Sequence, residues 1–431
     1  PAFNGGAEAR RCFGNWKRKI DGVYYVNQTY NEKRWAVAAA ACKRVMDMKN
    51  AGNPMYKLHT VESSSETPTL PTNVTLDPDY YKPWPDGAAG IDPYHSYADM
   101  FNGESVISSN AEWVWARYSN DLTANTRMSF PLHLGGWNHN SPTQKVVDAY
   151  RMFDGRNIDE SSAAYPYSES GFTTQQKTFS GYRLNSGVYN MYNNREMRFY
   201  ASIGFSECFW PMTSTTTAGD YNQTITYYYD SPDGKQNSNL NYPITGYVIK
   251  KFIHPMDAWA GTNALVMPKA FPIIRYADIL LMYAEALNNL TSSYTVELGG
   301  ETYTVSRDMA EIRLAFNQVR HRAGLPGPSQ AELSDPDKMQ KLFEQERMIE
   351  LLFENERFYD VRRWGIYERE ESKTIMGMNM DGNKESFYRR TVPNSPRIGK
   401  RVVNRKLMFM PLPDGEIRKI PLLDQNPGWD N

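Results

Sequence analysis

The sequence predicts a mainly α-helical fold, in which a tetratricopeptide-like scaffold of right-angled helices carries a large loop-rich insertion with short strands. Two observations indicate this fold. Apolar residues recur at helical spacing near the two ends of the chain but not in its middle. In the C-terminal part, two predicted helices begin at positions 276 and 308, about 32 residues apart. That separation is close to the ~34-residue period of tetratricopeptide helix pairs.

Three zones follow one another in what we expect to be a single domain that lacks the start of its fold. Residues 1–60 hold the end of an N-terminal helical part, residues 61–265 form a loop-rich region that faces the ligand, and residues 266–431 return to helices. In the first zone, a helix is predicted over residues 34–49, where small and apolar residues share one face.

The third zone contains three predicted helices, over residues 276–288, over residues 308–323 and from residue 336 to about residue 364. Asp308 is followed three positions later by a glutamate, which is the spacing of a capping box. Asp335 is followed directly by a proline, a favourable first residue for a helix. These signals place the helix starts within a residue or two.

The middle zone is rich in turn-forming residues and in aromatic residues. Loops of this extent are usually either functional or disordered, and the aromatic residues argue against disorder. Short strands are predicted over residues 112–118, 198–203 and 246–252. Within the first strand, Trp113 and Trp115 share a face, and we expect both in the core.

Composition excludes several functional classes. The chain has 48 Lys and Arg against 49 Asp and Glu, so it lacks the basic footprint of a nucleic-acid-binding protein. The longest apolar run, residues 35–42, is far shorter than the roughly 20 residues of a membrane-spanning helix. The aromatic content of 13% fits either a large aromatic core or a surface that stacks on flat, amphipathic ligands.

No cofactor site is predicted. Cys12, Cys42 and Cys208 are odd in number and far apart, so we expect buried thiols and not a disulfide framework. The histidines are scattered without a metal-binding spacing. Asp and Asn side chains in the loops leave structural calcium open, although no EF-hand spacing occurs.

Several segments carry a resemblance to a known family. Residues 271–286 read FPIIRYADILLMYAEA, residues 317–326 read NQVRHRAGLP, residues 346–364 read ERMIELLFENERFYDVRRW, and residues 425–428 near the end read QNPG. These segments resemble the SusD/RagB family of outer-membrane nutrient-binding lipoproteins. Asn355 stands where the family more often has glycine.

The resemblance implies a SusD-like α superhelix as the fold, and it also implies a function. It implies a non-enzymatic, cell-surface protein of a Gram-negative bacterium that binds oligosaccharides and delivers them to a SusC-like TonB-dependent transporter. It also implies a lipid anchor upstream of Pro1. Some family members serve peptides, so a peptide-binding or other nutrient-binding role in the same type of importer stays open.

Two further alternatives come from the helices. A helical-repeat scaffold fits the predicted helix pairs. A glycoside hydrolase would take two of Glu346, Glu350 and Glu354 as acid and base. Arginines at helical spacing keep these carboxylates ionised, which disfavours a general acid. We therefore expect a structural role for these residues: a ladder of ion pairs along one helix, which anchors that helix to loops and to other helices.

The ligand site is expected in the loop-rich zone, because loops on a rigid scaffold commonly carry binding residues. Aromatic residues beside prolines, glycines and polar partners are the candidates for stacking on a sugar ring. The candidate residues are Trp84, Trp137, Asn138, His139, Trp210 and Tyr228.

Overall fold

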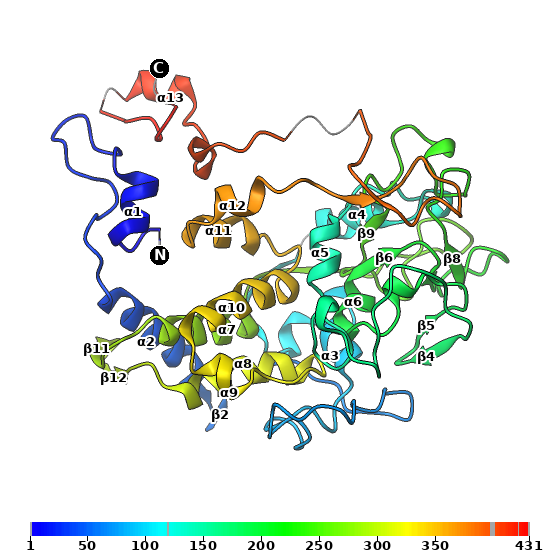
Figure 1. Cartoon of the computed structure of the whole chain (residues 1–431), viewed down its shortest axis with the longest axis horizontal. Helices are drawn as coiled ribbons and strands as arrows, with labels where there is room; N and C mark the ends of the chain where they lie inside the picture. The colour runs from blue at the N-terminus through cyan, green and yellow to red at the C-terminus, as the bar shows by residue number, and fades with distance from the viewer. Residues whose placement is uncertain (1, 119, 397–400, 421, 430–431) are drawn as a thin grey trace.

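The computed structural model describes residues 2–118, 120–396, 401–420 and 422–429, and its frame is a group of packed helices (Figure 1). The helix α7 is central, because α2, α8 and α10 all pack against it. These helices are α2 (Lys33–Asp47), α7 (Tyr276–Asn288), α8 (Met309–Arg322) and α10 (Pro336–Glu350). Apart from the end of the last one, they match the helices predicted from apolar periodicity.

The predicted helix starts are confirmed. The Asp308 carboxylate accepts hydrogen bonds from the backbone N–H groups of Ala310 and Glu311, and α8 begins there. The Asp335 carboxylate caps α10 in the same way, with Pro336 as the first helical residue. Both side chains satisfy backbone donors that have no partner within the helix.

The third predicted helix does not run unbroken to residue 364. It ends at Glu350, and a new helix, α11 (Glu356–Arg363), begins after a turn. Phe353 and Asn355 in that turn have φ angles of 63° and 69°. This left-handed backbone cannot continue an α-helix, so α11 leaves in a new direction.

The loop-rich zone is held by small elements and not by one sheet. All seven sheets of the described residues have two antiparallel strands. The segment predicted as a strand over residues 198–203 is instead mostly helix α6, which leads into β6. The helices of this zone are α3 (Pro93–Asn102), α4 (Asn120–Ser129), α5 (Gln144–Ala149) and α6 (Met197–Ser202).

The remaining elements are short. The strands are β1 (Lys49–Asn50), β2 (Asn53–Pro54), β3 (Trp113–Tyr118), β4 (Lys177–Phe179), β5 (Tyr182–Leu184), β6 (Ile203–Phe205), β7 (Cys208–Trp210), β8 (Gln223–Ile225), β9 (Tyr247–Ile249), β10 (Ala270–Arg275), β11 (Tyr294–Leu298), β12 (Glu301–Val305), β13 (Gly377–Met378) and β14 (Arg390–Thr391). The other helices are α1 (Gly6–Phe13), α9 (Gln330–Leu333), α12 (Tyr367–Glu371) and α13 (Asp414–Lys419).

Most of the loop-rich zone is organised around an aromatic core. Tyr192 stacks on Phe205 with ring centroids 4.5 Å apart, and both rings are fully buried. Trp210 and Tyr227 are fully buried in the same cluster. Aromatic rings bury large areas for few residues, which allows a region of turns and short strands to remain ordered.

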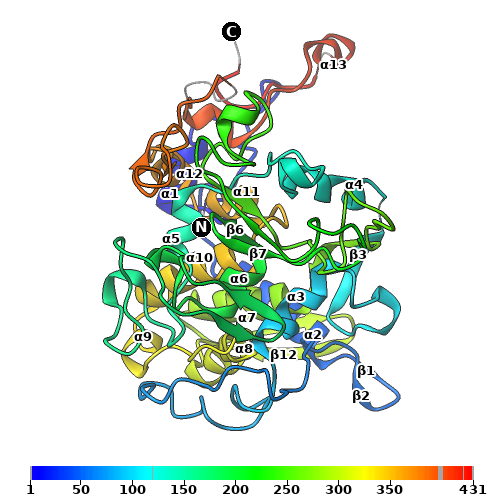
Figure 2. The same ribbon diagram turned by 90° about the vertical axis from the view of Figure 1, so that its right-hand side faces the viewer.

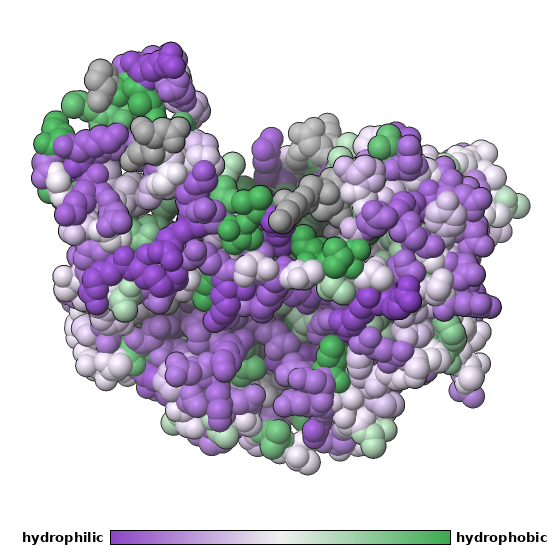
Figure 3. Space-filling view, turned by 45° about the horizontal axis from the view of Figure 1, so that its top comes forward, coloured by the Kyte–Doolittle hydropathy of each residue, from purple (hydrophilic) through white to green (hydrophobic). Residues whose placement is uncertain are grey.

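The two ends of the chain meet at one edge of the molecule (Figures 1 and 2). Ala2 and Phe13 share a small apolar cluster with Met408, and the Tyr25 hydroxyl donates to the Asp424 carboxylate. Figure 3 shows this end projecting from a face that is mainly hydrophilic, with hydrophobic residues gathered in patches. None of the helices among the described residues is long and apolar enough to span a membrane.

A buried network of ion pairs joins the helices to the loop-rich zone. We call it the charge network: Glu112, Glu196, Glu346, Glu350 and Glu354 pair with Arg198, Lys251, Arg275, Arg320 and Arg322. All ten residues are buried, and the five acidic groups balance the five basic ones. Glu346, Glu350 and Glu354 thus anchor their segment to loops and to other helices, as expected, although their partners in the charge network lie on other elements and not along the same helix.

Glu350 is the centre of the charge network. Its carboxylate bonds to Arg198 at 2.8 Å, to Arg275 at 2.8 Å and to Arg322. Burial alone would raise the pKa of Glu350, but Arg322, Arg275 and Arg198 hold it well below its usual value. The group therefore stays ionised within the core.

Replacing Glu350 by alanine should strongly destabilise the protein, because three arginines would keep buried charges without their shared partner. We expect a loss of about 3–5 kcal/mol in the free energy of unfolding, measured by urea denaturation. The matched control is Glu344→Ala on the same helix, which removes a pair with the exposed Arg369 and should cost about 1 kcal/mol or less. Equal losses for the two variants would contradict the assigned role of the charge network.

Candidate functional site

An open cavity of about 730 Å³ lies where β3, β10 and α4 meet. Strands β3 and β10 are antiparallel neighbours, with Arg117 opposite Phe271, so these two side chains share one face of the sheet. Figure 2 shows α4 and β3 on the same side of the molecule. We call this hollow the tryptophan cavity; it is lined by Arg117, Leu122, Ala124, Asn125, Arg127, Met128, Trp137, Trp259, Phe271 and Asn355.

Arg127 holds two indole rings at the tryptophan cavity. Its guanidinium carbon lies 5.0 Å from the ring centroid of Trp137 and 5.4 Å from that of Trp259. Both distances are within the range of cation–π attraction. Arg127 Nε also donates to the Gly135 carbonyl at 2.8 Å, and Trp259 Nε1 donates to Thr126 Oγ1 at 3.3 Å. The two rings are therefore fixed by contacts that need no ligand.

The loop that carries Trp137 folds back on the end of α4. Backbone N–H groups of Trp137 and Asn138 donate to the carbonyls of Arg127 and Phe130, each at 3.0 Å. Gly136 approaches Phe130 so closely that a Cβ would lie 2.1 Å from the Phe130 carbonyl oxygen. Only glycine fits there, and this close approach leaves Trp137 half-exposed at the cavity.

The two polar residues predicted to assist Trp137 have different positions. Asn138 is fully buried, and neither atom of its side-chain amide has a hydrogen-bond partner among the described residues. His139 Nε2 lies 2.9 Å from Asn241 Oδ1, and its ring centroid is 6.1 Å from that of Trp137. Of the predicted group, Trp137 alone lines the tryptophan cavity.

The other predicted ligand residues lie elsewhere. Trp84 is half-buried against the helical scaffold. Trp210 is fully buried in the aromatic core, so it has no surface to offer a ligand. Tyr228 is 7% exposed, and its hydroxyl bonds to the Glu207 carboxylate. Trp210 and Tyr228 are therefore not carried into the candidate site, because their rings complete the core of the loop-rich zone.

Several cavity residues were missed from the sequence. Trp259 lies in a turn-rich segment, which was a usable signal, but nothing local marks Arg117 or Arg127. Trp115, predicted to be in the core, is 61% exposed, whereas Trp113 is 6% exposed. Alternation along β3 puts Trp115 on the same face as Arg117. This two-stranded sheet runs from the core at Trp113 to the surface at Arg117.

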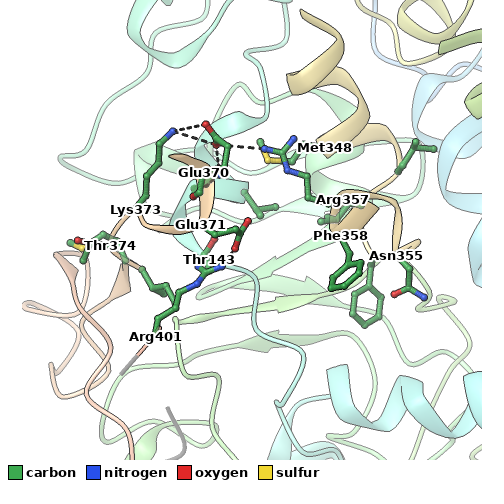
Figure 4. A pocket seen from close by; sticks show the side chains of 17 residues that line it. Thr143, Met348, Asn355, Arg357, Phe358, Glu370, Glu371, Lys373, Thr374 and Arg401 are labelled. Carbon is green, nitrogen blue, oxygen red and sulfur yellow. Dashed lines mark hydrogen bonds and ion pairs between the residues drawn. The ribbon is translucent and has the colours of Figure 1, made fainter. Parts of the chain in front are cut away.

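A second hollow, of about 330 Å³, adjoins α10, α11 and α12 (Figure 4). The Glu370 carboxylate lies at its rim and pairs with Lys145 Nζ at 2.5 Å, Lys373 Nζ at 3.1 Å and Arg357 at 3.6 Å. Asn355 lines this hollow as well as the tryptophan cavity, so the two are neighbours. We call it the α10–α12 cavity; its lining includes Thr143, Val146, Met348, Leu351, Leu352, Phe353, Phe358, Glu371, Thr374, Ile375, Met376 and Arg401.

Metal ligands do not cluster in the part of the chain that the structure describes. Within those residues, no group of three or more His, Cys, Asp or Glu side chains is placed to hold a metal ion. Cys12, Cys42 and Cys208 are buried and unpaired.

Comparison with known proteins identifies a common fold. The model of the SusD family matches residues 103–429. The SusD-like protein P2 of Formosa agariphila is 29% identical over 176 residues, which are 39% of this chain and 28% of that protein. The chain thus spans less than a third of this curated relative.

Solved structures match over nearly the whole chain. BT4246 superposes with a TM-score of 0.71 and 20% identity, over 100% of this chain and 70% of its own. The SusD-like protein BF3747 of Bacteroides fragilis gives a TM-score of 0.60 and 24% identity, over 92% and 62% of the two chains. The predicted tetratricopeptide-like helical fold with a loop-rich insertion is confirmed.

The rim of the α10–α12 cavity predicts a pH-dependent contribution to stability. Burial acts to raise the pKa of Glu370, but Lys145 and Lys373 lower it from 4.5 to about 2. Because folding lowers this pKa, the ionised Glu370 carboxylate contributes its full stabilisation above pH 4.5. This contribution is lost as the pH falls towards 2. Glu370→Gln should therefore destabilise the protein at pH 6 and less so at pH 3, measured by urea denaturation. A pH-independent effect of Glu370→Gln would contradict this assignment.

Proposed function

The chain belongs to the SusD family, and on this basis we propose that it binds glycans at the tryptophan cavity. One observation carries the proposal: Arg127 holds Trp137 and Trp259 at an open cavity through contacts within the protein. Side chains that are already fixed lose little conformational freedom on binding. The wide opening suits an extended chain of sugars.

The cavity offers the two kinds of contact that a saccharide needs. The C–H face of a pyranose ring is apolar and packs on an indole face. The guanidinium groups of Arg117 and Arg127 and the amide of Asn125 lie in the same lining and can bond to sugar hydroxyls. Because the tryptophan and α10–α12 cavities share Asn355, a longer saccharide has a second surface within reach.

Binding without catalysis fits this lining. Glycoside hydrolysis commonly needs two carboxyl groups on opposite sides of the glycosidic bond. The described residues of the tryptophan cavity include none. Glu346, Glu350 and Glu354, the carboxylates considered above, are buried in the charge network, where they pair with arginines.

The proposed role extends to a partner and a location. Family membership supports a protein anchored by an upstream lipid at the cell surface of the outer membrane, which delivers its ligand to a SusC-like TonB-dependent transporter. Peptide binding in the same type of importer is the alternative outcome of the binding test below.

Truncation of either tryptophan should weaken glycan binding. We expect Trp137→Ala and Trp259→Ala each to raise the Kd for a bound oligosaccharide about tenfold, which corresponds to about 1.4 kcal/mol. Isothermal titration calorimetry against panels of oligosaccharides and peptides measures this. Trp84→Ala is the control, because Trp84 packs on the scaffold away from the cavity lining.

The titration has three outcomes, which decide the class of ligand and the position of the site. Saccharide binding that only the two cavity variants weaken supports the proposal. Binding of peptides but not of saccharides would replace the glycan by a peptide. Saccharide binding that Trp84→Ala weakens most would place the site elsewhere in the loop-rich zone.

A further inference from the structure

The tryptophan cavity carries positive charge without an acidic counterpart. Its described lining contains two arginines, Arg117 and Arg127, and no aspartate or glutamate. The chain as a whole is almost neutral, with 48 basic against 49 acidic residues. The cavity thus has a local excess of positive charge that the chain as a whole lacks.

The guanidinium donors of both arginines are largely free. Arg127 uses Nε for the Gly135 carbonyl, and no described residue bonds to either of its terminal nitrogens. Arg117 has no side-chain hydrogen bond or ion pair with any described residue, although a guanidinium group carries five N–H donors. Arg117 is exposed and Arg127 is half-buried, so donors of both are available to a ligand that supplies acceptors.

The neighbouring α10–α12 cavity allows its basic groups to be compared with those of the tryptophan cavity. Each of its basic groups has a carboxylate partner: Lys145, Lys373 and Arg357 share Glu370, and Arg401 pairs with Glu371. The neighbouring tryptophan cavity has the same kind of cations but not the carboxylates. In the α10–α12 cavity, unlike the tryptophan cavity, each lining cation is therefore engaged by a carboxylate.

From this we infer that the tryptophan cavity selects anionic saccharides, in which a carboxylate or sulfate ester pairs with Arg117 and Arg127. The inference rests on the proposed glycan binding and adds its chemical class. A planar guanidinium matches the two oxygens of such a group and forms strong, charge-assisted hydrogen bonds. The pyranose ring that bears the anion packs on Trp137 or Trp259, so charge and stacking act on one residue of the ligand.

The half-buried position of Arg127 makes a pair with an anion stronger there than a fully exposed surface ion pair. A fully exposed pair contributes about 0–1 kcal/mol. Charges that are partly removed from water interact more strongly. The anion also relieves the repulsion between two like charges that share one lining. Neutral sugars would still stack and bond, but without this electrostatic contribution.

The test compares saccharides that differ only in charge. Calorimetric titration uses oligogalacturonate beside its methyl ester, and sulfated beside desulfated galactan oligosaccharides, at low and at high NaCl concentration. We expect at least a tenfold lower Kd for the anionic member of one pair, and a smaller preference at high salt because exposed charges are screened. The pair that shows the preference distinguishes a uronate from a sulfate ester.

The variants separate charge from ring placement. Arg117→Gln leaves the contacts of both indoles intact, so it should weaken binding of the anionic member of a pair more than binding of the neutral member, and thereby reduce the anionic preference. Arg127→Gln also releases the two rings and should weaken both members of a pair. Arg127→Lys keeps the charge but loses the planar fork, so an intermediate preference is expected. Arg313→Gln on α8, whose side chain bonds to Gln330 outside the cavity, is the charge-matched control.

The outcomes keep the two proposals apart. Equal affinity for charged and neutral members overturns the anionic selectivity and leaves glycan binding in place. An anionic preference that survives Arg117→Gln, or that Arg313→Gln reduces equally, also overturns it. Failure to bind any saccharide removes the proposed function and the inference together.

Discussion

The charge network is the constraint on which the rest of the structure depends. It brings five carboxylates and five basic groups into the core, from α6, α8, α10, the end of β10 and the segments around them. Removing so many charges from water is costly, and the cost is offset only when each group finds its partners in good geometry. An arrangement of the helices and loops that separated these partners would leave bare charges in the core. The network therefore disfavours alternative packings more than it adds net stability, and it fixes the loop-rich zone against the scaffold.

The same network positions the candidate site. Glu112 directly precedes β3, Arg275 is the last residue of β10, and Glu354 directly precedes Asn355. Each of these three network residues is thus next to, or within, a segment that lines the tryptophan cavity. Glu112 and Glu354 both bond to Arg275, so the strands and the turn before α11 are tied at one buried point. This anchoring positions the walls of the tryptophan cavity, together with the short β3–β10 sheet that extends from it to the surface.

How much the sequence could predict depends on the range of the interactions. Helices α2, α7 and α8 and the caps of α8 and α10 follow from local spacing, and the local motifs sufficed to identify the family. The end of α10 did not follow, because Phe353 and Asn355 adopt left-handed backbone that no local pattern required. The site depends on residues from 117 to 355, brought together by tertiary packing. Trp137 was found from its glycine-rich loop, whereas Trp210 was selected by the same kind of cue and proved to be core. A tryptophan in a loop rich in turns serves equally well as an anchor or as a binding surface, and only its burial distinguishes the two.

Arginines occur in two different settings in this molecule. Those of the charge network pair with carboxylates, and those of the tryptophan cavity do not. Arg198, Arg275 and Arg322 are each saturated by carboxylates, in sites from which water is excluded. Arg117 and Arg127 lie at an open cavity beside aromatic rings, with most of their donors unused. No described carboxylate pairs with Arg117 or Arg127, in contrast to the arginines of the charge network. Leaving them free costs the folded state a modest repulsion, and it preserves charge and donors for a ligand that brings the missing acceptors.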